Sequence, residues 1–299
     1  GPRRSVSALA VARAPGKLLL TGAYAVLEGA PALVVAVDRY AVARGEPVDH
    51  APAREIAAAF PSGGAPTVDT SSLYYGETKL GLGSSAAALV AAVAAADLRA
   101  GAEVLDKKAI FLRAREAHQR AQGGGSGVDV AASTFGGVLR YQDGTPTAAA
   151  LPTGVVLEVW WSGTPARTSS LLGQVRALAA RDASAYRACM GALVAASENA
   201  ADSVDSSSFL AASRAFAGAL RALGSAAAAP IVPPGFSVLG DVAAEEGGAF
   251  FGSGAGGGDV AVFLGNSPSS PRFRARAAEH AIVPLALAID FSGVSAVKA

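Results

Sequence analysis

The sequence predicts an α+β fold, and three observations support this class. Strand-like and helix-like segments are mixed along the chain without the regular alternation that a doubly wound parallel sheet requires. Glycine-rich stretches at 81–85, 123–127 and 252–258 interrupt apolar or Ala-rich runs. The length of 299 residues suits one large domain or two moderate ones with a substantial core.

The first part of the chain is expected to form strands. Residues 8–13 and 17–21 are apolar or alternating and are separated by a Pro-Gly turn, and the Val-rich stretch 32–37 follows. Residues 46–76 are rich in Pro, Gly and Ser and have no clear periodicity. They predict a loop or a short hairpin, expected to be mobile.

Two helices are expected at 84–100 and 106–121, because both stretches contain Ala, Leu and Arg without Pro. The stretch GGVLRYQDG (136–144) predicts a strand that enters a turn. The stretch VVLEVWWSG (155–163) predicts a buried strand.

The second part of the chain is expected to be mostly helical over 168–224, in two or three pieces, with a break at PPGFSV (233–238). Residues 247–265 read as strand, glycine loop and strand, and 283–294 as a last strand. A polar, Pro-containing turn within 145–165 suggests a division into domains 1–155 and 156–299.

Composition argues against several classes of partner. The net charge is +1 without a basic block, so nucleic acid is not expected. Cys189 is the single cysteine, which excludes an internal disulfide and a Cys-based zinc site and favours a reducing cytoplasm. The apolar run 86–96 is too short to cross a membrane, and no signal peptide is visible.

The stretch GLGSSAA (81–87) is a candidate phosphate cradle. Glycine lets a ligand approach the main chain, and Ser84 is a suitable N-cap for the following helix. The free N–H groups and the dipole at a helix start favour an anion. The stretch matches neither G-x-x-x-x-G-K-[ST] nor G-x-G-x-x-G. An ordinary capped turn is the alternative.

Three further elements contain candidate site residues. The glycine loop in FFGSGAGGGDVAVFLG (250–265) lies between apolar runs, which is typical of a close backbone or ligand approach. Asp129 follows a glycine loop and is either a helix N-cap or a base near a reacting hydroxyl. Lys17, after the Pro-Gly turn of APGK, is either a surface lysine or a partner of phosphate.

Taken together and in this order, the four elements resemble the GHMP kinase family. The similarity extends over 12–40, 79–98, 117–141 and 250–264, and more loosely over 283–294. Within the family, the motif GAYAVLEG, the Lys before GLGSS, and AHQRAQG followed by GSGVDVAAS are similar to the phosphomevalonate kinase branch. Ala23 departs from the pattern, because bacterial relatives commonly have Glu at this position.

The resemblance implies a GHMP kinase fold, with an N-terminal half like domain 2 of ribosomal protein S5 and a ferredoxin-like C-terminal half. It implies ATP-dependent phosphorylation of 5-phosphomevalonate to 5-diphosphomevalonate with Mg²⁺. The sequence leaves open whether the protein is a monomer or a homodimer. A mevalonate kinase or another small-molecule GHMP kinase is the first alternative. A nucleotide-binding protein without catalysis is the second.

The resemblance also implies the site residues. Lys17 and Asp129 would be catalytic, and Ser85 would contact the metal. The family's metal-binding carboxylate corresponds to a place near Glu116 or His118. Arg140 and Lys79 are candidate cations of the cleft. The nucleotide would be bound by Lys79, Gly81, Leu82, Gly83, Ser84, Ser85 and Ala86. The acceptor would be bound by Lys17, Tyr24, Ser126, Asp129, Ser253, Gly254, Ala255 and Gly256.

Overall fold

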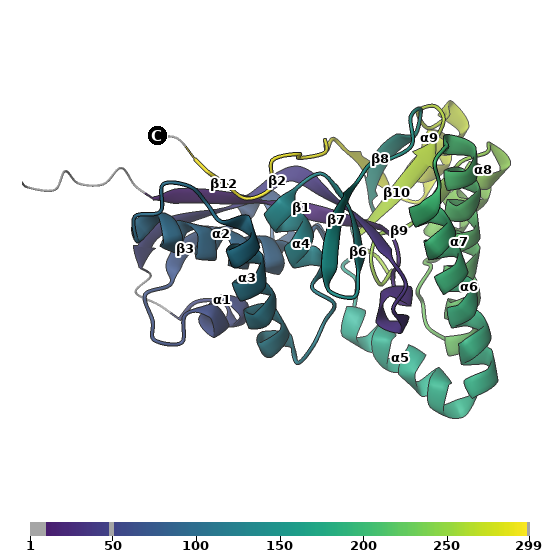
Figure 1. Cartoon of the computed structure of the whole chain (residues 1–299). Coiled ribbons are helices and arrows are strands. Elements are labelled where there is room, and N and C mark those ends of the chain that lie inside the picture. The colour runs from purple at the N-terminus through teal and green to yellow at the C-terminus, as the bar shows by residue number, and fades with distance from the viewer. Residues whose placement is uncertain (1–9, 48–50, 298–299) are drawn as a thin grey trace, which may run out of the picture.

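The computed structural model describes residues 10–47 and 51–297. Residues 8–9 of the first predicted strand, and residues 48–50 of the predicted 46–76 loop, lie outside this range. Helices and mostly antiparallel strands are mixed along the chain, so the predicted α+β class is confirmed (Figure 1).

The first sheet is built on a long antiparallel pair, β1 (Val11–Thr21) and β2 (Ala32–Pro47). The two strands predicted at 8–13 and 17–21 are therefore one strand within the described residues. The Pro-Gly step does not end β1 because the pairing only shifts register between Pro15 and Gly16. The strand order is β12-β1-β2-β6-β7, and β3 also pairs with β2. The other members are β3 (Pro66–Asp69), β6 (Val138–Gln142), β7 (Thr145–Ala149) and β12 (Ser295–Ala296).

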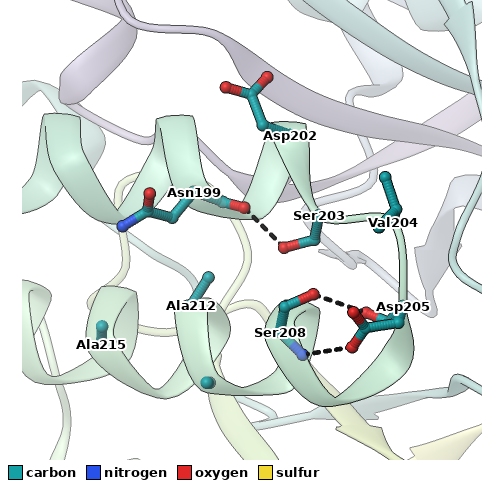
Figure 2. A pocket seen from close by; sticks show the side chains of 9 residues that line it. Asn199, Asp202, Ser203, Val204, Asp205, Ser208, Ala212 and Ala215 are labelled. Atoms are coloured by element: carbon teal, nitrogen blue, oxygen red, sulfur yellow. Dashed lines mark hydrogen bonds between the residues drawn. The ribbon is translucent and has the colours of Figure 1, made fainter.

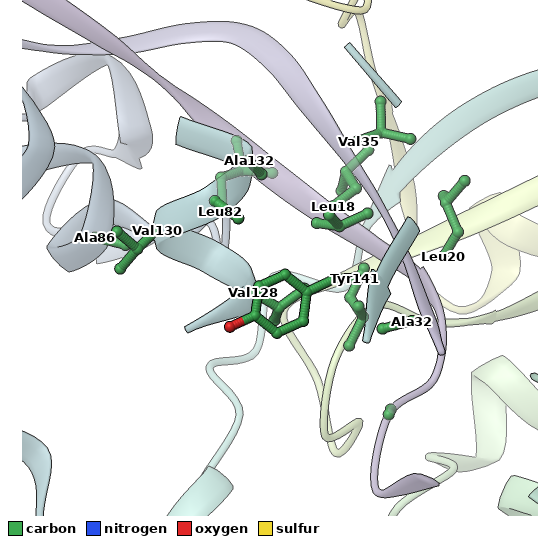
Figure 3. Packing of buried hydrophobic residues seen from close by; sticks show 14 of the residues in the cluster. Leu18, Leu20, Ala32, Val35, Leu82, Ala86, Val128, Val130, Ala132 and Tyr141 are labelled. Carbon is green, nitrogen blue, oxygen red and sulfur yellow. The ribbon is translucent and has the colours of Figure 1, made fainter. Parts of the chain in front are cut away.

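Helices α2 (Ser84–Arg99) and α4 (Val128–Phe135) pack against β1 and β2. Every residue of α2 from 86 to 95 is buried, because its small side chains allow close approach to the sheet. In Figure 3, Leu18 and Val35 of the sheet lie near Leu82 and Val130. Helix α3 (Lys107–Gln122) covers α2. The helices predicted at 84–100 and 106–121 are confirmed.

The stretch 46–76 contains more regular structure than predicted: the expected short hairpin is present only at its end, in β4 and β5, and a helix and a strand precede it. Strand β2 extends to Pro47, and β3 pairs with it. Ile56 and Leu73 are buried in the core, which holds these short pieces in place. The pieces are α1 (Arg54–Ala59), β3, the 3₁₀ turn η2 (Ser71–Leu73), and the hairpin of β4 (Tyr74–Tyr75) and β5 (Thr78–Lys79).

The second sheet has the order β11-β8-β10-β9. Its strands are β8 (Val156–Trp161), β9 (Ala249–Gly252), β10 (Val260–Gly265) and β11 (Val283–Leu285). The predicted strand–glycine loop–strand arrangement at 247–265 is confirmed. The predicted last strand at 283–294 is confirmed only at β11, because Ile289 forms a single bridge to Val37 instead of continuing a ladder.

Helices occupy the right side of Figure 1 beside this second sheet. The 168–224 region was predicted to form two or three helices, and it forms three. The PPGFSV break is instead the start of a helix, because Pro234 occupies its first turn, where a missing N–H costs nothing. The helices are α5 (Thr168–Arg181), α6 (Ala183–Asp202), α7 (Ser206–Ala227), α8 (Pro234–Glu245) and α9 (Pro271–Glu279).

The end of the described chain returns to the first sheet. Strand β12 pairs with β1, and the N–H of Asp290 donates to Ala36 O at 2.9 Å. A short 3₁₀ turn, η1 (Ala25–Glu28), follows β1 and contacts α6. The two sheets are thus connected by several segments, and the predicted domain boundary at 155/156 stays a prediction.

Candidate active site

The sequence motifs meet at one cavity of about 370 Å³. Its walls come from β1, the turn before α2, the start of α4, the segment before α5 and the loop between β9 and β10. Segments far apart in sequence therefore form a single site. The lining residues are Lys17, Leu19, Lys79, Gly81, Gly83, Ser84, Ser85, Asp129, Pro165, Ala166, Thr168, Ser253, Gly254, Ala255, Gly256 and Asp259.

The glycine-serine turn opens α2 in a way that differs from the predicted cap. Gly83, with φ +72°, is the N-cap residue, and Ser84 is the first residue of the helix. A Cβ at Gly83 would lie 2.9 Å from Lys17 Cγ, so only glycine fits beside the lysine. The prediction that Ser84 is the N-cap is wrong. The hydroxyl-bearing residues Ser84 and Ser85 instead line the cavity beside the first-turn N–H groups.

Lys17 is held deep in the site by its own backbone. Its N–H donates to Leu82 O at 2.9 Å, and only 8% of the residue is exposed. Its Nζ lies 3.4 Å from Asp129 Oδ1. The interpretation of Lys17 as a snorkelling surface residue is therefore wrong. A buried ammonium group paired with one carboxylate keeps unused hydrogen-bond donors for an anionic ligand.

Asp129 lies in the first turn of α4, and Gly127, with φ +84°, is the N-cap. The interpretation of Asp129 as a helix N-cap is therefore wrong. Its side chain is 32% exposed and lines the cavity. The N-terminal ends of α2, α4 and α5 all reach this cavity, and their dipoles favour negative charge there.

The loop between β9 and β10 is fastened to the first strand. Ser253 Oγ accepts a hydrogen bond from the N–H of Leu19 at 2.9 Å, and the Tyr24 hydroxyl donates to Ala255 O at 2.7 Å. A Cβ at Gly256 would lie 2.2 Å from Ile231 O, so the loop is also packed tightly against the backbone of Ile231. Its backbone therefore forms a fixed wall of the cavity.

Asp259 is a cavity residue that the sequence analysis did not select. Burial raises the pKa of its carboxyl, while the Ala166 N–H and the charges of Lys17 and Lys79 act in the lowering direction. The signal that could have identified it is the acidic residue that ends the glycine loop SGAGGGD.

Some predicted site residues lie elsewhere. Tyr24 is buried, and its hydroxyl is occupied by Ala255 O. Leu82 and Ala86 point into the core (Figure 3), although the backbone of Leu82 contacts Lys17. Ser126 Oγ accepts from the Val128 N–H at 3.4 Å and is not among the lining residues. The side chains of these four residues therefore do not form the cavity wall.

The weaker candidates are also placed elsewhere. Arg140 does not face the cavity, because it pairs with Asp202. Glu116 is exposed and pairs with Arg120 one helical turn away. His118 is buried in α3, where its Nε2 lies 3.1 Å from Gln122 Nε2. Of the two predicted cleft cations, Lys79 alone lines the cavity.

A larger hollow of about 610 Å³ lies where α6 turns into α7 (Figure 2). Its polar groups complete the helix ends. Ser203 Oγ donates to Asn199 O at 2.6 Å, and Asp205 accepts from the Ser208 N–H at 2.8 Å. Alanines form much of the remaining wall. We therefore assign this hollow to helix packing.

Within residues 10–47 and 51–297, no group of three or more His, Cys, Asp or Glu side chains could hold a metal ion. The 370 Å³ cavity nevertheless offers oxygen ligands from Ser85, Asp129 and Asp259. Mg²⁺ prefers such ligands and is commonly bound by one or two of them together with phosphate oxygens and water. The cavity residues thus fit a metal that arrives with a nucleotide. None of the helices in the described residues is long and apolar enough to cross a membrane.

Comparison with known proteins identifies the family. Residues 32–137 match the N-terminal domain of GHMP kinases. The phosphomevalonate kinase of Streptomyces sp. (strain CL190) is 30% identical over 368 residues, covering 95% of this chain and 98% of that one. The chain belongs to the GHMP kinase family. It is therefore a kinase, and the predicted GHMP kinase fold is confirmed.

Solved structures of other proteins have the same fold. The phosphomevalonate kinase of Streptococcus pneumoniae, in complex with phosphomevalonate and AMPPNP, superposes with a TM-score of 0.71 at 20% identity, covering 93% of this chain and 99% of that one. The mevalonate kinase of Methanococcus jannaschii gives 0.74 at 14% identity over 95% and 99%. A protein from Listeria innocua gives 0.81 at 22% identity over 97% and 99%.

Proposed function

We propose that this GHMP kinase uses ATP to phosphorylate 5-phosphomevalonate to 5-diphosphomevalonate, in the mevalonate pathway of isoprenoid synthesis. The observation that carries the proposal is the single cavity that joins Lys17, Asp129, the Gly81–Ser85 turn and the 253–256 loop. The curated relative with 30% identity, a phosphomevalonate kinase, supports this acceptor.

The nucleotide phosphates would bind at the start of α2. The backbone N–H groups from Gly81 to Ala86 would donate hydrogen bonds to the phosphates there. Lys79 adds a positive charge at the same wall of the cavity. Leu82 and Ala86 would contribute through their backbones alone, because their side chains are buried in the core. Ser85 would hold Mg²⁺, which would neutralise the charge that develops on the β- and γ-phosphates.

The acceptor would lie against Ser253–Gly256, whose backbone is fixed to β1. An oxygen of the acceptor's phosphate attacks the γ-phosphorus in line, the bond from the γ-phosphorus to the bridging oxygen breaks, and ADP leaves. Lys17 would stabilise the bridging oxygen. Tyr24 would act through the loop, since its hydroxyl bonds Ala255 O.

Asp129 is assigned an orienting role toward Lys17. A phosphate monoester loses its second proton at a pKa of about 6. At pH 7 most of the acceptor's phosphate is therefore already deprotonated, and the attacking oxygen needs no base. Asp129 lies 3.4 Å from Lys17 Nζ and can hold the ammonium group in place. With mevalonate, by contrast, the attacking hydroxyl would need a base, and Asp129 would serve as that base.

The test is coupled ADP release with Mg-ATP, comparing 5-phosphomevalonate with mevalonate for the wild type and for Asp129→Ala. We expect turnover with 5-phosphomevalonate only. The variant should lose about 100-fold or more in kcat, as expected when a group that organises transition-state charge is removed. Asp202→Ala, which removes an exposed carboxylate outside the cavity, is the matched control.

Other results would change the assignment. Turnover with mevalonate alone would make the protein a mevalonate kinase. Binding of ATP without turnover of either compound would favour another small-molecule acceptor, and a screen of phosphorylated and free alcohols would follow. Failure of that screen would leave a nucleotide-binding protein without catalysis.

A further inference from the structure

Asp259 lines the same cavity, and no step of the proposed transfer uses it. It follows the glycine loop directly, and its φ of +56° places it in the left-handed region. Aspartate is one of the few residues other than glycine that adopt this region readily. The conformation points its side chain back toward the segment before α5 and toward Gly81.

Asp259 fastens the segment that leads into α5. Its N–H donates to Thr164 O at 2.7 Å, and its carbonyl accepts from the Ser162 N–H at 2.9 Å. Its side-chain Oδ1 accepts from the Ala166 N–H at 3.0 Å. Ala166 precedes Thr168, the first residue of α5, and both line the cavity. The carboxylate therefore fixes the approach to a helix N-terminus.

The same side chain is packed against the glycine-serine turn. A Cβ at Gly81 would lie 2.4 Å from Asp259 Cβ and 2.8 Å from Oδ2. Such distances are too short for any side chain, so the Gly81 backbone rests directly on the aspartate. One side chain thus contacts two backbone segments of the cavity wall, the Gly81 turn of the proposed nucleotide site and the segment before α5.

The charge of Asp259 by itself opposes this site. A carboxylate in a cavity that receives phosphates repels them, and its desolvation is also unfavourable. Electrostatics alone therefore predicts that removing the carboxylate tightens nucleotide binding. The contacts of the side chain predict the reverse, because they hold backbone groups in place before the ligand arrives.

We propose that Asp259 is a positioning residue that holds the Gly81 turn and the residues before α5 in the arrangement that binds the nucleotide phosphates. The inference rests on the proposed kinase site. It concerns nucleotide binding alone, which needs no acceptor. A wild type that binds AMPPNP but does not phosphorylate 5-phosphomevalonate would disprove the proposed acceptor and leave this inference open to the same test.

The experiment measures AMPPNP affinity by calorimetry for the wild type, Asp259→Ala and Asp259→Asn, with and without Mg²⁺. Alanine removes the acceptor for the Ala166 N–H, whereas asparagine keeps it and removes only the charge. We expect the alanine variant to bind about fivefold more weakly, the equivalent of one lost hydrogen bond. Asparagine should recover this loss in full or bind more tightly than the wild type, because it keeps the contact and removes the repulsion. Asp241→Ala, an exposed carboxylate paired with Arg221, is the control.

Three outcomes would overturn the inference. Tighter binding by Asp259→Ala would mean that the charge of the carboxylate dominates, and unchanged binding would mean that its contacts do not hold the nucleotide site. Equal weakening in both variants would show that the contacts retained by asparagine are not the cause. Weakening only with Mg²⁺ present would make Asp259 a metal ligand instead. If the alanine variant does not fold, Asp259→Ser, which is too short to reach the Ala166 N–H, replaces it with the same expectation.

Discussion

Tyr24 shows how a single residue can serve a site that its side chain does not enter. The motif resemblance placed it among the acceptor contacts, but the structure buries it, with φ +61°, and its hydroxyl donates to Ala255 O at 2.7 Å. A positive φ with ψ −47° is unfavourable for a large residue, so the surrounding structure must maintain it. Burial raises the pKa of the Tyr24 hydroxyl, which keeps it protonated as a donor.

Substitution Tyr24→Phe should loosen the 253–256 loop without opening a cavity. We expect the free energy of unfolding to fall by about 1 kcal/mol, the usual net value of one hydrogen bond. The KM for the acceptor should rise severalfold, with little change in the KM for ATP. Denaturant titration and steady-state kinetics measure the two effects. Tyr75→Phe, at an exposed position, is the control. An unchanged acceptor KM with the same loss of stability would limit Tyr24 to a structural role.

At the scale of elements, length decided what could be predicted. Helices α2 and α3, of 16 residues each, contain enough residues to show a pattern. Strands β4 and β5, of two residues each, are too short to show any pattern, and β12 is equally short. These pieces form because tertiary contacts fix them, so local sequence was uninformative. The segment between β11 and β12 belongs to this second group.

That segment is anchored to β2 by a side-chain link. The Tyr40 hydroxyl donates to Asp290 Oδ2 at 2.7 Å, while Asp290 Oδ1 accepts from the N–H groups of Ser292 and Gly293. Burial and the hydrogen bond to Asp290 raise the pKa of Tyr40 to about 12 from its ordinary value of 10. A raised pKa means that the folded state holds this proton more tightly than the unfolded chain does.

The link should therefore stabilise the protein below pH 10 and be lost as the pH rises from 10 to about 12. We expect Tyr40→Phe to lower the free energy of unfolding by about 1 kcal/mol at pH 8, a value reduced for partial exposure. The difference from the wild type should shrink by pH 11. Urea titrations at the two pH values measure it. A difference that is constant with pH would contradict the titration of this hydroxyl.

At the scale of the whole molecule, the two sheets are connected by non-covalent contacts as well as by the chain itself. Strand β12 pairs with β1, Ser253 and Tyr24 link the β9–β10 loop to the first strand, and α6 contacts β2 (Figure 1). The cavity lies at this junction, so its geometry depends on both halves. We infer that the halves are mechanically coupled even though each has its own sheet.

Coupled halves should unfold together. Both tryptophans, Trp160 and Trp161, lie on β8, so their fluorescence reports the second sheet, while circular dichroism reports the helices of both halves. We expect the two signals to give coincident urea midpoints. Addition of AMPPNP should shift both midpoints upward together. Two separated transitions would instead support independent domains divided near 155/156.

The sequence by itself determined the family, the long helices and the residues whose chemistry suits phosphate. Glycines at 81, 83, 254 and 256–258 and the pair Lys17 and Asp129 are local signals that need no knowledge of the fold. Only the tertiary structure decided which of them share a cavity. It placed Tyr24 and Arg140 outside, made Gly83 the helix cap, and brought Asp259 against Gly81, 178 positions earlier in the numbering. Side-chain direction and long-range contact depend on packing between distant segments, and a local pattern does not encode that packing.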